Sequence, residues 1–375
     1  MKKRIGIVGG GQLGRLLAEA AHPLGFHVSV LDPTPKSPAG RVADLQIVAD
    51  YKDSMAIEKL ALEIDYLTFE IELADSDILD ELQKQGILVN PSGKTLSIIK
   101  DKFKQKKFLR KHNIPVADFI DVKDRGDIER AIEAFKYPVF LKARFDAYDG
   151  RGNALIEKPD DIESALLKLV DRDLYVEQYV PFKKEIAVIA ARGIDGTVVT
   201  YPAVQTIHKN NICHVVIAPA AINNKARGMA RKLAEDVLKH FSGAGVFGIE
   251  MFVTHDGEIL INEIAPRVHN SGHHTIESST TSQFEQHIRA ITGMPLKDTT
   301  MKIAHAVMIN ILGDRNGPVQ LSGVSEAEAL PGVFVHIYDK IETRYERKMG
   351  HVTVVAKTAK EAMKLAKRAR SMISI

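Results

Sequence analysis

The chain contains one cysteine, no tryptophan and no long apolar run, and two of these absences exclude classes of protein. Cys213 alone can form neither an intramolecular disulfide nor a thiolate metal site, so nothing indicates an oxidising compartment. No stretch approaches the roughly 20 apolar residues that a membrane helix needs. The basic start is followed by only residues 5–8 before three glycines, which is too short for the core of a signal peptide. We therefore expect a cytoplasmic protein without membrane contacts.

The sequence also lacks a marked excess of charge of either sign. Lys and Arg total 51 and Asp and Glu total 48, which gives a formal net charge of +3 over 375 residues. A dedicated nucleic-acid binder usually shows a strong basic excess, so we expect no nucleic-acid partner. The 45% of hydrophobic residues is ordinary for a globular protein, and the length suffices for two to three domains.

The pattern of apolar residues changes along the chain. In residues 1–92 short apolar runs alternate with helical periodicity, which predicts a parallel α/β sheet. Beyond them, a basic amphipathic helix at 100–112 precedes strand-like runs at 174–180 and 185–191, which we assign to an antiparallel sheet. The last part holds further strand-like runs and a basic helix at 359–372. We predict three domains, at residues 1–92, 93–296 and 297–375.

A glycine turn opens the first domain. Gly9-Gly10-Gly11-Gln12-Leu13-Gly14 fits G-x-G-x-x-G between a strand and a helix. The backbone N–H groups of such a turn can hold a phosphate at the helix N-terminus. Asp32 ends the next strand, roughly where an acid that binds ribose would lie in a dinucleotide site. A phosphate site, a dinucleotide site and a purely structural turn all remain open.

A second glycine-containing loop lies in the middle of the chain. Tyr148-Asp149-Gly150-Arg151-Gly152-Asn153 follows a strand that ends at Lys142. Two glycines around an arginine make a flexible loop that can lie over phosphates, and Lys142 could neutralise one of their charges. The alternative is a polar hairpin loop without a ligand.

Two glutamates are predicted to face each other across a hairpin. Asp256-Gly257 favours a two-residue turn between the apolar strands 247–253 and 258–263, and this register pairs Glu250 with Glu263. Directly opposed like charges destabilise a sheet, and a hard divalent cation such as Mg²⁺ would offset that cost. The alternative is a looser turn whose carboxylates face solvent separately.

The polar, irregular segment at 265–274 follows the second of these strands. Arg267 can clamp a phosphoryl group during its transfer. His269, His273 and His274 could suggest zinc, but they have no cysteine and no helical frame. We interpret the segment as a loop that binds an anion or substrate.

Together these motifs resemble the ATP-grasp superfamily, and within it the N5-carboxyaminoimidazole ribonucleotide synthetase family. The resemblance rests on the glycine turn, on Phe69-Glu70-Ile71-Glu72, on the loop at 148–152, and on Asn262-Glu263-Ile264-Ala265-Pro266-Arg267-Val268-His269-Asn270-Ser271-Gly272-His273. Residues 338–351 extend it over nearly the whole chain. It implies a fold of mixed α/β and α+β class: a Rossmann-like pre-ATP-grasp domain, a two-lobed ATP-grasp domain with the nucleotide between its lobes, and a small mixed C-terminal domain.

The resemblance also implies a set of site residues. Those implied for ATP are Lys102, Lys142, Ala147, Tyr148, Asp149, Gly150, Arg151, Gly152, Asn153, Glu177, Gln178, Tyr179, Val180, Glu185, His208, Asn262 and Glu263. Those implied for the ribonucleotide substrate are Gly11, Gln12, Leu13, Glu70, Tyr148, Asp149, Arg151, His269, Asn270, Ser271, His273, Lys340, Arg347 and Lys348. The implied catalytic residues are Arg267, Lys142, Asp149 and Arg151, and the implied magnesium ligands are Glu250 and Glu263.

The implied reaction is the ATP-dependent carboxylation of 5-aminoimidazole ribonucleotide with bicarbonate in purine biosynthesis. It runs through carboxyphosphate, yields ADP and phosphate, and is carried out by a homodimer. Two alternatives remain: another ATP-grasp ligase, such as a formate-dependent glycinamide ribonucleotide transformylase, and a dinucleotide-binding protein. The sequence departs from the family pattern at Phe145-Asp146-Ala147, where two glycines usually precede the tyrosine.

Overall fold

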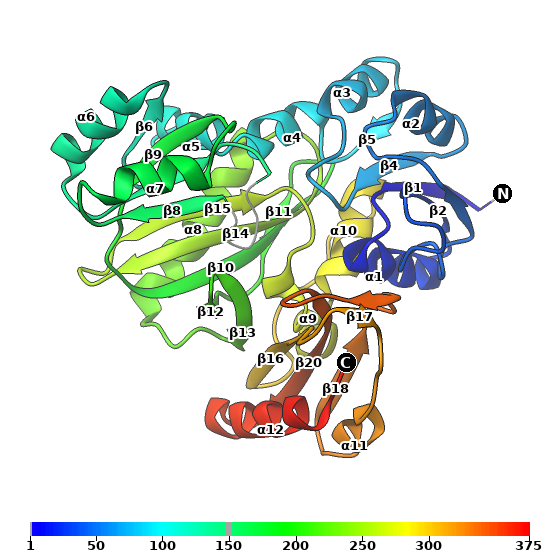
Figure 1. Cartoon of the computed structure of the whole chain (residues 1–375). Helices are drawn as coiled ribbons and strands as arrows, with labels where there is room; N and C mark the ends of the chain where they lie inside the picture. The colour runs from blue at the N-terminus through cyan, green and yellow to red at the C-terminus, as the bar shows by residue number, and fades with distance from the viewer. Residues whose placement is uncertain (1, 147–151) are drawn as a thin grey trace.

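The computed structural model describes residues 2–146 and 152–375 (Figure 1). The predictions made for Ala147, Tyr148, Asp149, Gly150 and Arg151 therefore lie outside the described residues. No helix within these two ranges combines the length and the apolar character needed to cross a membrane. The chain forms an N-terminal body, a larger central body and a C-terminal body that lies against both (Figure 1).

The N-terminal body is a five-stranded parallel sheet covered by helices, as predicted. Its strands follow the order β3-β2-β1-β4-β5. They are β1 (Arg4–Val8), β2 (His27–Leu31), β3 (Leu45–Ile47), β4 (Tyr66–Phe69) and β5 (Leu88–Val89). The helices are α1 (Gln12–Ala21), α2 (Ser54–Ala61) and α3 (Ser76–Lys84), with a short 3-10 turn at His22–Leu24. The central strands are buried on both faces, which is why they read as continuous apolar runs.

The predicted basic helix at 100–112 is two helices. They are α4 (Gly93–Lys100) and α5 (Lys102–Lys111), and they meet at Asp101. The backbone of Asp101 is extended, and its carboxylate accepts hydrogen bonds from the N–H groups of Phe103 and Lys104. Asp101 therefore caps a new helix instead of continuing the first, and it sets Lys102 at the first position of α5.

The central body has two sheets, and this corrects the prediction for 174–191. The smaller sheet has the order β6-β9-β7-β8. It consists of β6 (Phe119–Val122), β7 (Val139–Ala143), β8 (Asn153–Ile156) and β9 (Leu174–Gln178), with α6 (Arg125–Phe135) and α7 (Asp161–Lys168). The next strand, β10 (Phe182–Arg192), belongs to the other sheet. The two predicted neighbours therefore lie in different lobes, joined by the short segment between them.

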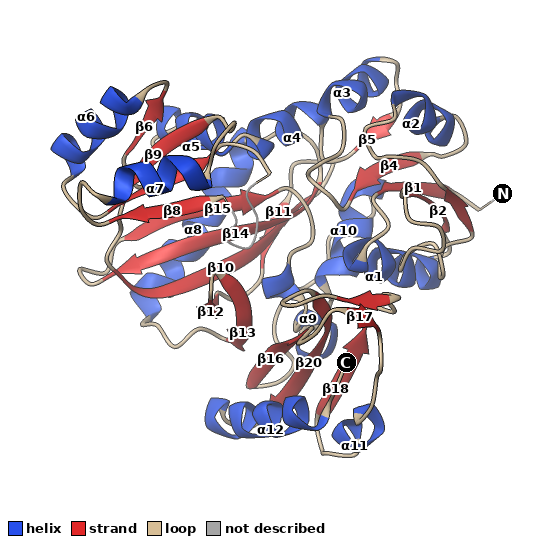
Figure 2. Ribbon diagram, in the orientation of Figure 1, coloured by secondary structure: helices blue, strands red, loops and turns tan. Residues whose placement is uncertain are grey.

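The larger sheet has nine strands: eight follow the order β15-β14-β10-β12-β13-β16-β20-β18, and β11 pairs with β10 off this path. All of these neighbouring strands pair antiparallel. Its central-body members are β10, β11 (Val198–Thr200), β12 (Val204–Lys209), β13 (Ile212–Ala218), β14 (Gly245–Thr254) and β15 (Ile259–Ala265). The long helix α8 (Asn224–His240) packs on β10 and β14 (Figure 2).

The C-terminal strands continue this same sheet. β16 (His305–Leu312) pairs with β13, so the sheet crosses the predicted boundary between residues 296 and 297. The remaining elements are α9 (Thr275–Ser278), α10 (Gln283–Thr292), β17 (Gly317–Pro318), α11 (Val324–Glu328), β18 (Val333–Ile337), β19 (Glu342–Thr343), β20 (Lys348–Ala356) and α12 (Ala359–Met372), with a 3-10 turn at Asn270–Gly272. The predicted domain limits remain predictions.

A buried histidine joins the N-terminal body to the central one. His287 of α10 accepts a hydrogen bond at Nδ1 from the Val246 N–H (3.1 Å), and its Nε2 lies 2.9 Å from Thr68 Oγ1 on β4. Because Nδ1 accepts, the ring is neutral and carries its proton on Nε2. Burial lowers the pKa of His287 from 6.5 to about 3. The contact therefore depends on an uncharged imidazole.

We predict that this contact makes stability depend on pH. The pKa of His287 is lower in the folded state than in the unfolded chain. Its contribution to the free energy of unfolding is therefore complete above the unfolded-state pKa of 6.5 and is lost as pH falls toward about 3. Between about pH 7.5 and pH 5.5 one such group accounts for about 1.4 kcal/mol. In urea unfolding, His287→Gln should therefore lose about that much less stability over this range than the wild type. The exposed His255→Gln is the control, and equal losses in all three proteins would contradict the prediction.

Candidate active site

The predicted opposition of Glu250 and Glu263 is confirmed, although the turn is not the predicted one. The turn between β14 and β15 has three residues, because the Thr254 N–H bonds to the Glu258 carbonyl (3.0 Å) and Gly257 takes a positive φ of 84°. On β15 a bulge at Asn262 adds one residue, so that Glu250 pairs with Glu263. The extra residue in the turn and the extra residue in the strand cancel, which restores the predicted pairing.

The two carboxylates make this end of the hairpin strongly acidic. Burial, and then the charge of Glu263, raise the pKa of Glu250 to about 7. The ammonium group of Lys102, at the start of α5, contacts Glu263. Burial opposes the charge of Lys102, but Glu263, Glu72 and Glu250 outweigh it and raise the pKa of this lysine. Lys102 thus compensates one carboxylate of the pair and leaves the other without a cation in contact among the described residues.

A second cluster of charges is formed by residues of the smaller sheet and of α5. Lys142 of β7 donates to Glu177 of β9 (2.5 Å), and Lys106 of α5 lies 2.6 Å from the other oxygen of the same carboxylate. Burial would raise the pKa of Glu177, but the two lysines outweigh it and lower that pKa. Burial and the charge of Lys142 lower the pKa of Lys106. One buried carboxylate therefore holds two lysines, the buried Lys106 and the partly buried Lys142, with a net positive charge.

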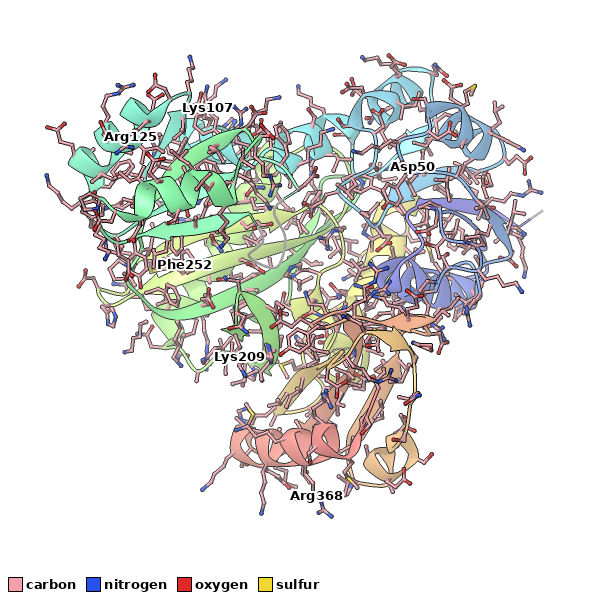
Figure 3. The ribbon with its side chains drawn as sticks, viewed as in Figure 1. Asp50, Lys107, Arg125, Lys209, Phe252 and Arg368 are labelled. Carbon is pink, nitrogen blue, oxygen red and sulfur yellow. The ribbon has the colours of Figure 1, made fainter. Side chains whose placement is uncertain are left out.

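Lys106 was not among the residues predicted for the site. The signal for it was present, because Lys102 and Lys106 are four residues apart and therefore lie on one face of a helix. The sequence alone does not show which of the seven basic residues of this segment are buried. Lys106 is 3% exposed, whereas its neighbour Lys107 faces solvent (Figure 3).

The other described residues predicted for the nucleotide lie on strands of both lobes and on the link between the lobes. His208 of β12 and Glu185 of β10 lie 2.7 Å apart, and this contact raises the pKa of His208 although burial opposes it. Tyr179 stacks on Phe140 with ring centroids 5.9 Å apart. Gln178 ends β9 and Val180 follows in the link between the lobes, where it is buried. Gly152 bonds through its carbonyl to Ala143, and Asn153 pairs with Lys142 across β7 and β8.

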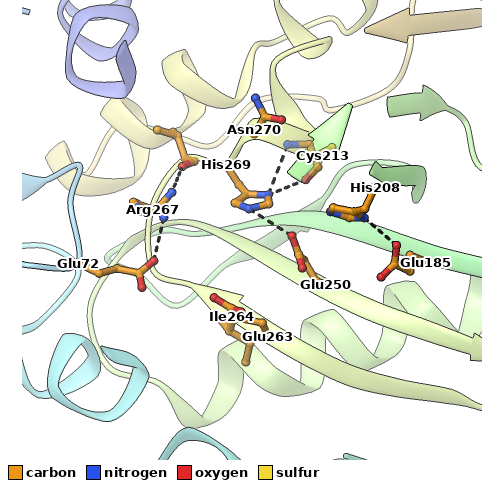
Figure 4. Close-up of polar contacts among 12 residues, drawn as sticks. Glu72, Glu185, His208, Cys213, Glu250, Glu263, Ile264, Arg267, His269 and Asn270 are labelled. Carbon is orange, nitrogen blue, oxygen red and sulfur yellow. Dashed lines mark hydrogen bonds and ion pairs between the residues drawn. The ribbon is translucent and has the colours of Figure 1, made fainter. Parts of the chain in front are cut away.

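The polar segment after β15 surrounds an arginine. Arg267 Nη2 lies 2.9 Å from Glu72 Oε1, and Arg267 Nη1 donates to the Val268 carbonyl (Figure 4). His269 Nε2 lies 3.5 Å from Glu250 Oε1. Burial, followed by the charge of Arg267, holds the pKa of His269 well below its usual range. His269 therefore faces the carboxylate pair as a neutral ring.

Each predicted histidine of this segment has a protein partner of its own. His269 bonds to Ser271, His273 lies 3.1 Å from the Gln283 side-chain amide, and His274 bonds to Ser278. Asn270 exchanges hydrogen bonds with Asn310 of β16. No group of three or more possible metal-ligating residues occurs within the described ranges. The segment thus presents an arginine and neutral polar groups, as an anion-binding loop would.

The glycine turn is occupied by carboxylates of the protein itself. Gly10 N–H donates to Asp32 (2.8 Å) and Gly11 N–H donates to Glu70 (2.7 Å). These are the donors that the pyrophosphate of a dinucleotide would use, and Asp32 is committed a second time to the Thr34 N–H. The first residues of α1, Gln12 and Leu13, have no side-chain cap. The turn therefore fits a phosphate at the start of α1 better than a dinucleotide.

C-terminal residues come close to this turn. Arg15 of α1 contacts Asp339, and the next residue, Lys340, donates to the Lys348 carbonyl (2.8 Å). Burial raises the pKa of Glu70, against the opposing charges of Arg267 and Lys340. Arg347 donates to the Glu342 carbonyl (2.8 Å). Glu70 thus lies close enough to Arg267 and Lys340, one predicted residue from each of the other bodies, for their charges to interact, whereas the side chain of Arg347 bonds to its own segment.

Three family models match successive parts of the chain. They are a ribonucleotide synthetase preATP-grasp domain at residues 1–100, an ATP-grasp domain at 107–284 and a phosphoribosylaminoimidazole carboxylase C-terminal domain at 306–365. The N5-carboxyaminoimidazole ribonucleotide synthase of Bacillus subtilis is 39% identical over 350 residues, which cover 93% of this chain and 90% of that protein. The chain belongs to the N5-carboxyaminoimidazole ribonucleotide synthase family.

Solved structures of this family have the same fold. The N5-carboxyaminoimidazole ribonucleotide synthetase of Thermotoga maritima is 46% identical with a TM-score of 0.90, covering 100% of this chain and 99% of that one. The Aspergillus clavatus N5-carboxyaminoimidazole synthase, solved with ADP and 5-aminoimidazole ribonucleotide, is 36% identical with a TM-score of 0.91, over 99% and 98% of the two chains. The predicted three-part architecture and the predicted family are confirmed, and the central body is a domain of the ATP-grasp family.

Some relatives are longer than this chain. The phosphoribosylaminoimidazole carboxylase of Schizosaccharomyces pombe is 44% identical over 368 residues, which cover 96% of this chain and 66% of that protein. The chain thus spans 66% of the length of this relative.

We predict that Lys106 is required for nucleotide binding. Lys106→Met leaves Glu177 paired with Lys142 alone, which draws the charge of Lys142 away from a phosphate. Breaking a buried ion pair also costs about 3 kcal/mol or more of stability. Calorimetry should show at least tenfold weaker ADP binding, and thermal unfolding should show a lower midpoint.

The control for this prediction is Lys107→Met, which removes the neighbouring exposed charge. It should change neither quantity appreciably. Equal behaviour of the two variants would show that the buried lysine has no special part in the site.

Proposed function

We propose that this chain carboxylates 5-aminoimidazole ribonucleotide with bicarbonate, at the expense of ATP, in purine biosynthesis. The observations that carry the proposal are an acidic pair (Glu250 and Glu263), a largely buried lysine (Lys142) that shares a carboxylate with Lys106, and an arginine (Arg267) whose charge acts on Glu70 at the glycine turn of the first domain. These are the groups that a reaction between a nucleoside triphosphate and a second phosphorylated substrate needs. The complex of the Aspergillus clavatus relative with ADP and 5-aminoimidazole ribonucleotide supports it.

ATP would bind between the two lobes of the central body. Lys102 and Lys142 would contact its phosphates, and the segment 147–153 would cover them. Because both oxygens of Glu177 are engaged by lysines, the base would be recognised through the backbone of residues 177–180. Glu185, His208 and Asn262 would contact the ribose and the phosphates.

Mg²⁺ fits the carboxylate pair. Glu250 and Glu263 are opposed in register, burial and their repulsion raise the pKa of Glu250, and both offer the hard oxygen ligands that this ion prefers. Mg²⁺ usually takes only one or two carboxylates and completes its coordination with phosphates and water. When bound, the ion would neutralise phosphate charge during transfer.

The ribonucleotide would lie across the three bodies. Its phosphate would meet the start of α1, at Gly11, Gln12 and Leu13, where the helix dipole favours an anion. Its remaining contacts are proposed to come from Glu70, Tyr148, Asp149, Arg151, His269, Asn270, Ser271, His273, Lys340, Arg347 and Lys348.

The chemistry has two steps. An oxygen of bicarbonate attacks the γ-phosphorus of ATP, and the bond to ADP breaks, which yields carboxyphosphate. The exocyclic amine of the ribonucleotide then attacks the carboxyl carbon, or CO₂ released from it; phosphate leaves and the amine loses a proton. Lys142, Arg267, Asp149 and Arg151 would orient the reactants and neutralise charge, since positioning and electrostatics dominate phosphoryl transfer.

We further propose that the protein works in the cytoplasm as a homodimer. This assembly and this location are supported by the family resemblance and by a composition without membrane or nucleic-acid features.

The reaction itself can be tested by cosubstrate. We predict that rapid ADP release requires both 5-aminoimidazole ribonucleotide and bicarbonate, with slow release from bicarbonate alone because water consumes carboxyphosphate. Formate with glycinamide ribonucleotide should give no turnover, and NADH should not be oxidised. Full activity with formate in bicarbonate-free buffer would instead assign the chain to another ATP-grasp ligase.

The metal pair can be tested by one substitution. Glu263→Gln removes a charge with little change in volume, and it should lower turnover about 100-fold, or about 2.7 kcal/mol of activation free energy. Binding of ADP should lose most of its dependence on magnesium concentration. Glu258→Gln, an exposed glutamate of the same hairpin, is the control. Wild-type magnesium dependence in Glu263→Gln would remove this residue from the proposed metal site.

A further inference from the structure

One ion pair connects the N-terminal body to the polar segment at 265–274. Its acidic member is Glu72 and its basic member is Arg267. Glu72 lies just beyond β4, and its Oε1 is 2.9 Å from Nη2 of Arg267 (Figure 4). The two side chains are 20% and 22% exposed, so the pair is largely shielded from water. An ion pair in such a place is screened less by salt than a surface pair.

The remaining contacts of Arg267 leave part of its guanidinium unused. Nη1 donates to the carbonyl of Val268, the next residue in the chain. Nε is buried and makes no hydrogen bond within the described residues. A buried arginine N–H without an acceptor is costly unless a ligand supplies one. Glu72 is thus the only carboxylate in contact with Arg267 in the described part of the chain, while Nε remains for an anion.

We propose that Glu72 is a positioning residue that holds Arg267 in place for the transfer step. This inference rests on the proposed function, in which Arg267 acts on the transferring group. An arginine side chain carries about 2 kcal/mol of rotamer entropy, so an unheld guanidinium samples several positions. A displacement of about 1 Å at a reacting centre can cost on the order of 100-fold in rate. Glu72 fixes Nη2 of the guanidinium, the Val268 carbonyl holds Nη1, and Nε is left for the ligand.

The place of Glu72 in the chain gives this contact a second consequence. Two residues earlier, Glu70 accepts the Gly11 N–H at the turn proposed for the substrate phosphate. Glu70 is also fixed through its backbone, because its N–H donates to the Val8 carbonyl (2.9 Å). The short segment from Glu70 to Glu72 therefore makes two contacts. Glu70 contacts the glycine turn proposed for the substrate phosphate, and Glu72 contacts Arg267.

A double-mutant cycle in the full-length enzyme tests the proposal. Turnover of ATP with bicarbonate and 5-aminoimidazole ribonucleotide is measured for the wild type, Glu72→Ala, Arg267→Ala and the double variant. Glu72→Ala should lower kcat at least tenfold, with the KM for ATP and for the ribonucleotide changed less than twofold. Because Glu72 acts through Arg267, adding Glu72→Ala to Arg267→Ala should cause no further loss.

A second readout separates positioning from a merely structural role. With Arg267 misplaced, more carboxyphosphate is lost to water, so the ratio of ADP formed to ribonucleotide carboxylated should rise above one in Glu72→Ala. Glu72→Gln keeps the volume and one acceptor oxygen, and it should fall between the wild type and Glu72→Ala. If Glu72→Ala does not fold, the same measurements are made on Glu72→Gln.

The control is Glu129→Ala, which removes one of the two acidic partners of Arg125 from an exposed ion pair of equal length (2.9 Å) on the small lobe (Figure 3). It should leave kcat and the ADP ratio unchanged. An unchanged kcat in both Glu72 variants, or an equal further loss in the Arg267→Ala background, would overturn the proposal. If the wild type itself shows no turnover with these substrates, the proposed function fails instead.

Discussion

The repulsion between Glu250 and Glu263 is the constraint around which the rest of the site is organised. Strand pairing sets two carboxylates opposite each other, and the partial burial of Glu250 reduces the water that would screen their repulsion. The chain answers with Lys102, which contacts Glu263 and takes its position from the cap at Asp101. The charge of Glu250 is left without a cation in contact among the described residues, and a metal cation bound together with a polyphosphate could neutralise it.

The same imbalance between buried charge and counter-charge occurs, with opposite sign, in the lysine cluster. Lys106 and Lys142 share one carboxylate, and Arg267 keeps an unused Nε although Glu72 contacts its Nη2. In the acidic pair and in the lysine cluster the protein supplies less counter-charge than it buries, whereas Arg267 and Glu72 balance in charge and leave one hydrogen-bond donor unused. The imbalance favours binding of a charged ligand and disfavours the empty site, so ligand affinity and the stability of the free protein are set by the same residues.

Much of this follows from the sequence, and the failures have identifiable causes. The parallel sheet of the first domain follows from its apolar runs, and the hairpin follows from Asp256-Gly257. The register of Glu250 and Glu263 came out right although the turn is one residue longer, because the bulge at Asn262 compensates for it. A bulge has no strong sequence signal, so this agreement depended on two errors that cancel.

Other features could not be predicted from the sequence because they depend on contacts between distant parts of the chain. The strands at 174–178 and 182–192 are consecutive in sequence, yet their alternation does not tell whether they share a sheet. The burial of Lys106 depends on the lobe that packs over α5, and the partner of Glu72 is far away in the sequence. The side-chain predictions for residues 147–151 concern a part of the chain outside the described ranges. Long-range contacts of this kind cannot be read from local periodicity.

The pairing of β13 with β16 has a consequence for how the chain can be divided. Because the C-terminal strands extend the central sheet, a fragment ending near residue 296 would expose the backbone N–H and C=O groups of β13 along a new edge. Unprotected edges of this kind recruit strands from other molecules. The last strands therefore serve as a cover for the sheet of the ATP-grasp lobe, and fragments meant to isolate that lobe would have to carry them along.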